Sequence, residues 1–214
     1  MSTYILTSMF PDGIHGKNKE VFQKLLTKTK KFAFVASEFE KNQDITDHYF
    51  RFFLNMFEKI GIYFEDSYVV DGRMNANQAK EAVSKADVVW LAGGDTPVQF
   101  GYLVKYGLDE VIRQHNGIII GMSAGSINLA KTAICTRTCQ HTEYQVYNGL
   151  GCVDISVEPH FDCEHVTDEL IEISKKYTIY GLCDDSIIIC ANGEKQFYGN
   201  IYKLTNGIIE KVDT

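Results

Sequence analysis

The chain has 214 residues, enough for one domain that buries roughly 70% of the surface its unfolded form would expose. Its 28 acidic and 21 basic residues give a formal net charge of −7, which disfavours nucleic acid and anionic membranes as partners and favours a small-molecule or peptide substrate. No apolar run approaches the roughly 20 residues that span a bilayer, and the first residues lack a basic segment followed by a long apolar stretch. We therefore expect a cytoplasmic protein.

The six cysteines are confined to the second half of the chain and form no C-x-x-C pair, so we expect them to be reduced and mostly buried. The densest group of metal-ligand side chains runs from His160 to His165. No second ligand group at metal-site spacing accompanies it. We expect neither a metal nor another cofactor.

Short apolar runs rich in β-branched and aromatic residues recur through the first 120 positions, with helical patterns between them. The runs cover residues 4–6, 32–35, 68–70, 88–91 and 118–120, and the helical patterns lie near 17–29, 45–60, 75–85, 97–115 and 164–176. Continuous apolar runs are typical of strands buried on both faces. The alternation predicts an α/β fold, a three-layer sandwich around a mostly parallel central sheet, with ligand sites at the carboxyl ends of the strands.

The clearest helical pattern runs from Ile45 to Ile60, where apolar residues three and four positions apart form one face. We expect this helix to be capped near Asp44 and to stop at Gly61.

The last part of the chain differs, because its apolar runs at 187–189, 196–198 and 201–204 are close together. Asn192-Gly193 and Asn206-Gly207 are dipeptides that favour tight turns, so we expect antiparallel β-hairpins at the end of the sheet. No repeat, low-complexity tract or proline-rich linker divides the sequence. The prediction is a single domain over residues 1–214.

The most informative motif is G-x-S-x-G, from Gly121 to Gly125, between a buried run and a helical pattern. A serine on such a nucleophile elbow lies in a strained turn, where glycines avoid clashes with the neighbouring backbone. This context predicts that Ser123 is a nucleophile and that the Ala124 N–H faces an oxyanion. The alternative is an ordinary glycine-rich turn with an inert serine.

A second glycine turn, Gly93-Gly94, also follows a buried run and precedes a helical pattern. It lacks the G-x-G-x-x-G spacing of a dinucleotide loop. The N–H of Gly93 or Gly94 is therefore the candidate for the second oxyanion donor, with a plain tight turn as the alternative.

Three histidines follow Ser123. His160 ends the run 153–159, so it is expected at the carboxyl end of a strand, on the same side as the elbow, and is the candidate general base. His165 is expected in the first turn of the next helix and His141 in a polar loop, where both fit surface roles better.

A third residue should hold the imidazole through its other nitrogen. The acidic residues nearest to His160 are poorly placed: Asp154, Glu158 and Asp162. The first would lie about 20 Å away along an extended strand, and the other two share the local chain direction. Asp184 and Asp185 can arrive from a neighbouring strand; we favour Asp184 and leave open Asp185 or a helix-capping role for either.

Four of these segments, in this order, resemble the peptidase E family of serine peptidases, which includes aspartyl dipeptidases and the related cyanophycinases; they are 93–96, 121–126, 159–161 and 181–186. The resemblance implies a fold similar to class I glutamine amidotransferases and a triad in the order Ser123, His160, Asp184. In α/β-hydrolases the acid precedes the histidine, and here no histidine follows His165. The amidotransferases carry cysteine at the elbow, so Ser123 argues against their activity.

The sequence departs from that family in two features. Its aspartyl dipeptidases carry arginines on the helix after the histidine motif, whereas residues 163–170 contain none here, so a strong preference for an N-terminal aspartate is not expected. Arg137, in the polar loop after the elbow helix, is the nearby candidate for binding a substrate carboxylate, and a solvated loop charge is the alternative. The family usually has glutamate where this chain has the shorter Asp184.

These features together predict a serine-type peptidase that acts on small peptides, and they leave a homodimer open. An esterase or acyltransferase that uses the same triad is one alternative. A non-catalytic binding protein on the same scaffold is another.

Overall fold

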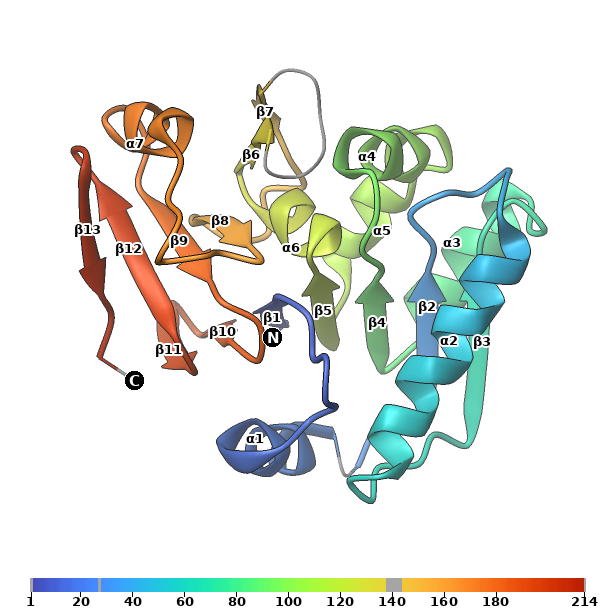
Figure 1. The fold of residues 1–214 in the computed structure, drawn as a ribbon. Coiled ribbons are helices and arrows are strands. Elements are labelled where there is room, and N and C mark those ends of the chain that lie inside the picture. Colours follow the sequence, from blue (N-terminus) through green and yellow to red (C-terminus); the bar gives the residue numbers. More distant parts are fainter. Residues whose placement is uncertain (1, 27, 138–143, 214) are drawn as a thin grey trace.

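A seven-stranded sheet forms the centre of the computed structural model, which describes residues 2–26, 28–137 and 144–213 (Figure 1). Its five parallel strands are β1 (Thr3–Thr7), β2 (Lys31–Val35), β3 (Asp66–Val70), β4 (Val88–Leu91) and β5 (Ile118–Met122). The antiparallel β10 (Ile187–Ala191) and β11 (Glu194–Tyr198) complete the order β11-β10-β1-β5-β4-β2-β3. The mostly parallel sheet predicted from the apolar runs is confirmed.

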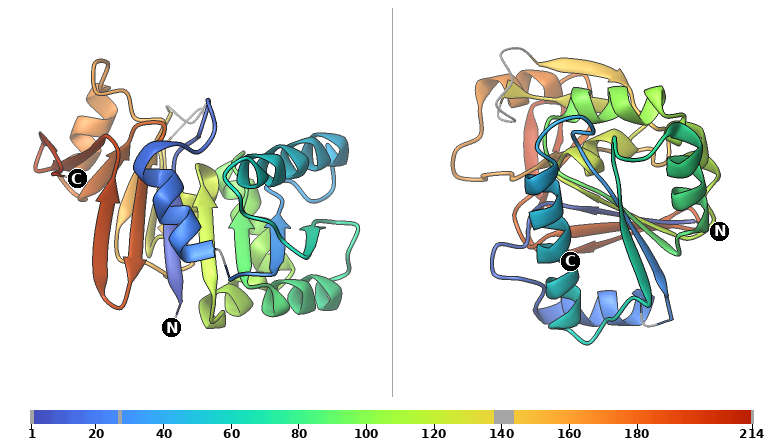
Figure 2. Two further views of the ribbon diagram at one scale, coloured as in Figure 1. Left: turned by 90° about the horizontal axis from the view of Figure 1, so that it is seen from below. Right: turned by 90° about the vertical axis from the view of Figure 1, so that its right-hand side faces the viewer.

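Helices cover both faces of this sheet, as Figure 2 shows. One face packs on α1 (Gly16–Leu26) and α2 (Gln43–Glu58), and the other on α3 (Ala76–Lys85), α4 (Thr96–Lys105), α5 (Leu108–Gln114) and α6 (Ala124–Leu129). The helix predicted near 97–115 is two helices, because Gly107 adopts a left-handed φ of 65° between them. The arrangement is the predicted three-layer sandwich. None of the helices in the described residues is long and apolar enough to cross a membrane.

Helix α2 begins earlier than predicted and buries only part of its apolar face. Its N-cap is Asn42, in a left-handed conformation with no side-chain cap, and Asp44 lies in the first turn. Phe53, Met56 and Phe57 are buried. In contrast, Ile45 is 51% exposed and Tyr49 is 46% exposed. The N-terminal half of the stripe therefore lies outside the core, beside the carboxyl end of β2.

A second sheet follows the sandwich in the sequence and holds β8 (Ser156–Pro159), β9 (Ile179–Leu182), β12 (Ile201–Thr205) and β13 (Ile208–Lys211). Its order is β13-β12-β9-β8, with β8 and β9 parallel. Helix α7 (Asp168–Ser174) packs on it, and the hairpin of β6 (Thr132–Cys135) and β7 (Gln145–Asn148) forms a separate pair.

Both predicted C-terminal hairpins are present, but they belong to different sheets. The turn at Asn192-Gly193 joins β10 to β11 in the central sheet, and the turn at Asn206-Gly207 joins β12 to β13 in the second sheet. All four residues have a positive φ, as tight hairpin turns require. The expectation that both hairpins extend one sheet was wrong, because turn chemistry fixes a local pairing and not the sheet that receives it.

The cysteines are less buried than predicted. Cys135 is buried, whereas Cys152, Cys183 and Cys190 are partly exposed and Cys163 is exposed. The sixth, Cys139, lies outside the described residues.

The elbow after β5 packs closely against the backbone of β4, so a side chain on Gly125 should lower the stability of the fold. A Cβ on Gly125 would overlap the carbonyl oxygen of Leu91, so Gly125→Ala should lower the free energy of unfolding by about 1–3 kcal/mol. A Cβ on Gly101, in α4, would meet open space, and Gly101→Ala should be neutral or stabilising by up to about 1 kcal/mol. Urea denaturation measures both, and unchanged stability in Gly125→Ala would contradict the close approach of the elbow to β4.

Candidate active site

Ser123 occupies the turn between β5 and α6 in a conformation that non-glycine residues rarely adopt, with φ 51° and ψ −110°. Its backbone N–H donates to the Thr7 carbonyl at 3.0 Å, which ties the turn to the end of β1. A Cβ on Gly121 would lie 2.6 Å from the Gly125 carbonyl carbon, so both flanking positions require glycine. The structure thus contains the strained strand-to-helix elbow that the motif predicted.

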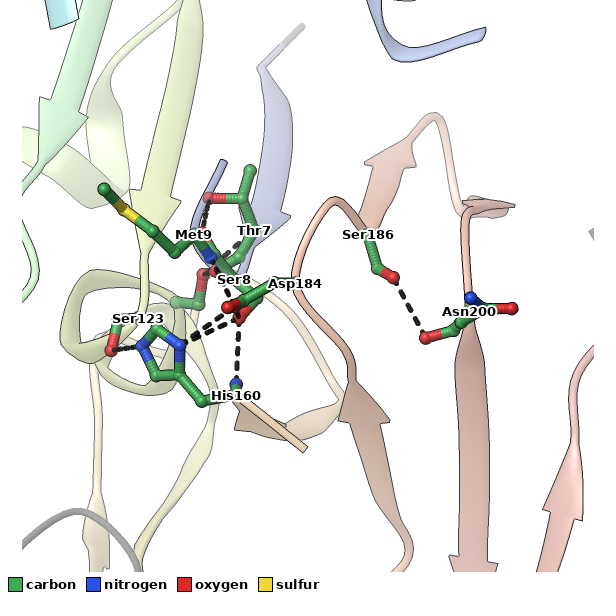
Figure 3. A network of polar contacts seen from close by, with 9 residues as sticks. Thr7, Ser8, Met9, Ser123, His160, Asp184, Ser186 and Asn200 are labelled. Carbon is green, nitrogen blue, oxygen red and sulfur yellow. Dashed lines mark hydrogen bonds and ion pairs between the residues drawn. The ribbon is translucent and has the colours of Figure 1, made fainter. Parts of the chain in front are cut away.

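His160 directly follows β8 and points its ring at the elbow (Figure 3). Its Nε2 lies 3.0 Å from the Ser123 Oγ. The residue has φ 55°, and its backbone N–H donates to the Ser8 Oγ at 2.8 Å. The next residue, Phe161, returns to the β8–β9 ladder by donating to the Leu182 carbonyl. Backbone bonds on both sides therefore fix where the imidazole lies.

Asp184 completes a continuous chain of hydrogen bonds. Because β8 and β9 are parallel and Pro159 pairs with Leu182, His160 and Asp184 both follow the carboxyl ends of adjacent strands. The Asp184 Oδ1 lies 2.9 Å from His160 Nδ1, so the short side chain reaches the ring. Both side chains are partly open to solvent, at 49% exposed for His160 and 40% for Asp184.

The neighbouring carboxyl of Asp185 is oriented differently. Asp185 has φ 62°, and its Oδ1 is buried without a hydrogen-bond partner among the described residues. Burial raises the pKa of this carboxyl above its ordinary value, against the opposing effect of His15. The structure therefore brings Asp184, and not Asp185, to His160.

The other acidic and histidine candidates lie apart from Ser123. Asp162 binds His165, whose side chain is 79% exposed, and Glu158 accepts from the Thr136 hydroxyl. Asp154 is exposed. The expectation for His165 was wrong in one respect, because α7 begins only at Asp168 and leaves His165 in the preceding loop. His141 lies outside the described residues.

Ser8 is a site residue that sequence reasoning missed. Its buried hydroxyl donates to the Asp184 Oδ1 at 2.6 Å and accepts from the His160 N–H at 2.8 Å. The next N–H, of Met9, also donates to Asp184 Oδ1, at 3.2 Å. Ser8 directly follows the β1 strand, and a polar residue at the carboxyl end of a buried strand was the available signal.

Thr7 and Ser126 connect this group to the elbow. The Ser126 hydroxyl is buried and accepts from the Thr7 N–H at 2.8 Å, and it lies 2.6 Å from the Gly121 carbonyl to which it donates. The segment from Thr7 to Met9 therefore contacts the elbow on one side and the Asp184 turn on the other, as Figure 3 shows in part.

The second glycine turn lies against the elbow. A Cβ on Gly93 would be 2.8 Å from the Met122 Cε and 3.3 Å from the Ser123 Cβ. Gly94 has φ 146°, and Asp95 caps α4 by accepting from the Val98 N–H at 2.9 Å. The turn is thus held beside Ser123. At the start of α6, the N–H of Ala124 belongs to the first helical residues, which have no acceptor within the helix.

Arg137 is engaged elsewhere. Its Nε donates to Glu169 Oε1 at 2.6 Å and its backbone N–H to Glu169 Oε2 at 2.9 Å, which attaches it to α7. It is not among the residues that line the cleft at Ser123. A role for Arg137 in binding substrate stays a prediction without geometric support.

A serine on a strand-to-helix elbow, bonded to a histidine that is bonded to a carboxylate, is the arrangement of the serine hydrolases. The sequence matches the profile of peptidase family S51 over residues 7–197. The chain therefore belongs to the S51 family, the peptidase E family of serine peptidases. It is a serine peptidase, as the motifs predicted.

Two solved structures share the fold. A peptidase from an acI-B1 Actinobacterium superposes with a TM-score of 0.72 at 16% identity, covering 99% of this chain and 94% of the other. A protein assigned as peptidase E from Listeria monocytogenes EGD-e gives 0.67 at 18% identity, with both chains covered completely. A comparison with curated proteins finds no significant match.

The bonds of Ser8 predict a selective effect on catalysis. Ser8→Ala should lower kcat about 10-fold or more, because the imidazole loses a backbone anchor and Asp184 loses a charge-assisted bond worth about 1.5–3 kcal/mol. Steady-state kinetics and urea denaturation measure the two effects.

Ser174→Ala is the matched control for Ser8→Ala. Its hydroxyl is also buried, donates to one backbone carbonyl and accepts from one N–H, but it lies on α7. It should lower stability and leave kcat unchanged. If the two variants had the same kcat, Ser8 would have no part in positioning the site.

Proposed function

We propose that the chain hydrolyses small peptides through an acyl-enzyme formed on Ser123, with His160 as general base and Asp184 as the carboxylate that orients it. The observation that carries the proposal is the unbroken bond series from Ser123 Oγ to His160 Nε2 and from His160 Nδ1 to Asp184 Oδ1, at 3.0 and 2.9 Å. Family membership supports the reaction class.

In the first half of the reaction, His160 Nε2 takes the Ser123 proton while the Oγ attacks the peptide carbonyl carbon. Asp184 accepts from the Nδ1–H, which keeps Nε2 free as the acceptor and stabilises the imidazolium that forms. The imidazolium then donates its proton to the leaving amine, and the C–N bond breaks. A water that loses its proton to His160 then attacks the resulting ester; the bond from the acyl carbon to the Oγ breaks, and the imidazolium returns the proton to Ser123 as the acid product leaves.

The carbonyl oxygen becomes negatively charged during both attacks and needs fixed donors. The Ala124 N–H and the N–H of Gly93 or Gly94 are the groups that we assign to this role. Their support is position: Ala124 opens α6 next to the nucleophile, and a Cβ on Gly93 would be 3.3 Å from the Ser123 Cβ.

Removal of the nucleophile should abolish hydrolysis. Ser123→Ala loses only a hydroxyl, so the fold should remain while peptide turnover disappears.

His160→Ala should lower kcat on the order of 10³-fold or more, because nucleophile and base act as a unit. His165→Ala, which removes an exposed ring bonded to Asp162, is the control and should retain full activity. Normal turnover by Ser123→Ala would refute the proposal.

The adjacent residues Asp184 and Asp185 should respond differently to substitution by asparagine. Asp184→Asn should lower kcat strongly, because an amide favours the wrong imidazole tautomer and does not stabilise the imidazolium. Asp185→Asn removes a carboxyl that does not face His160 and should have a much smaller effect on kcat. Steady-state kinetics on one peptide compares them, and the reverse ranking would transfer the role to Asp185.

A further inference from the structure

An open cleft of about 450 Å³ lies beside Ser123, within the range of roughly 300–1,000 Å³ that is typical of ligand pockets. Ser123, His160 and the Gly93-Gly94 turn line it, together with residues from the end of β2 and from α2. A group bound in this cleft would therefore be next to the bond that Ser123 attacks.

The walls of the cleft are mainly apolar. Phe34 and Met122 come from the central sheet, and Ile45, Tyr49 and Phe53 from α2. Phe53 is buried, but Ile45 and Tyr49, in the same stripe of the helix, remain about half exposed. Large apolar side chains that stay open to water inside a hollow are typical of a surface that binds an apolar group.

The charge of the cleft disfavours an acidic ligand. Within the described part of the chain, no lysine or arginine lines it, and its carboxylate is Glu38. Burial opposes ionisation of Glu38, but hydrogen bonds from the Glu40 N–H, the Tyr102 hydroxyl and the Lys41 N–H, together with the Lys41 charge, outweigh it and lower the pKa of the carboxyl. Lys41 is near enough to contribute to that lowering but does not line the cleft.

A substrate carboxylate in this cleft would face Glu38 without a cationic partner, at a substantial cost in binding. The arginine that sequence reasoning considered for this purpose, Arg137, is bound to Glu169. Neutral polar groups at the rim, such as Asn42 and Thr46, can bind peptide backbone but cannot neutralise a charge.

We propose that the cleft binds a large apolar side chain, such as that of leucine, methionine or phenylalanine, on the residue next to the scissile bond. The inference rests on the proposed function and names its substrate class. Ile45 and Tyr49 select the side chain, and Glu38 excludes aspartate and glutamate.

Two dipeptide series test the preference, X-Ala and Ala-X, with leucine, phenylalanine, alanine, aspartate and lysine as X. In the series whose X enters the cleft, kcat/KM for leucine and phenylalanine should exceed that for alanine about tenfold or more, with aspartate lowest. Equal kcat/KM values in both series, or a preference for aspartate, would overturn the proposal.

Variants on α2 connect the preference to the cleft. Tyr49→Ser and Ile45→Ser should each reduce the ratio of kcat/KM for leucine to that for alanine several-fold. Phe52→Ser is the matched control, because Phe52 is an exposed aromatic residue of the same helix but lines a different cavity. The ratio of kcat/KM for leucine to that for alanine should be the same in this variant as in the wild type. A ratio unchanged in both cleft variants would show that the apolar side chain binds elsewhere.

A binding measurement separates this inference from the proposed reaction. Calorimetric titration of the Ser123→Ala variant with the same dipeptides should give tighter binding for leucine and phenylalanine than for aspartate, without any turnover. If the wild type hydrolyses none of the peptides but this order holds, the proposed function fails and the cleft assignment stands. Binding without an apolar preference would overturn the cleft assignment whatever the catalytic result.

Discussion

The hydrogen bonds of the segment from Thr7 to Met9, at the end of β1, hold the site together, because they join the two sheets that supply its residues. The Thr7 carbonyl accepts from the Ser123 N–H, and the Ser8 hydroxyl binds both the His160 N–H and the Asp184 carboxylate. The elbow belongs to the central sheet and His160 to the second one. A 3.0 Å contact between Ser123 and His160 therefore requires the sheets to keep a fixed relation, which this segment provides.

Much of this arrangement could be predicted, because its determinants are local. A buried strand, two glycines and a helix define the elbow around Ser123, and the end of an apolar run places His160 at a strand terminus. Asp184 was favoured from its place after an apolar run, but Asp185 stayed open, because the choice depends on the pairing of Pro159 with Leu182 that brings the two turns together. Ser8 is far along the sequence from all three, and its role depends on tertiary contacts that no spacing encodes.

The fold shows the same division between local and tertiary information. The hairpin dipeptide Asn206-Gly207 predicted a turn but not a second sheet, since sheet membership is decided by packing. The stripe on α2 predicted one apolar face but not how much of it is buried, and Ile45 and Tyr49 are exposed at the cleft. Apolar residues of a helical stripe that lie outside the core, in a cleft, are a better guide to the substrate than the catalytic motif. Members of one family can share a triad and differ in the cleft beside it.

Labelling with a fluorophosphonate, followed by peptide mapping by mass spectrometry, tests whether Ser123 is a nucleophile activated by His160. The reagent needs only an activated serine and no knowledge of the substrate. We expect one adduct, on Ser123, whose formation is much slower in His160→Ala. No adduct, an adduct on another residue, or labelling that is unaffected by the loss of His160 would contradict it.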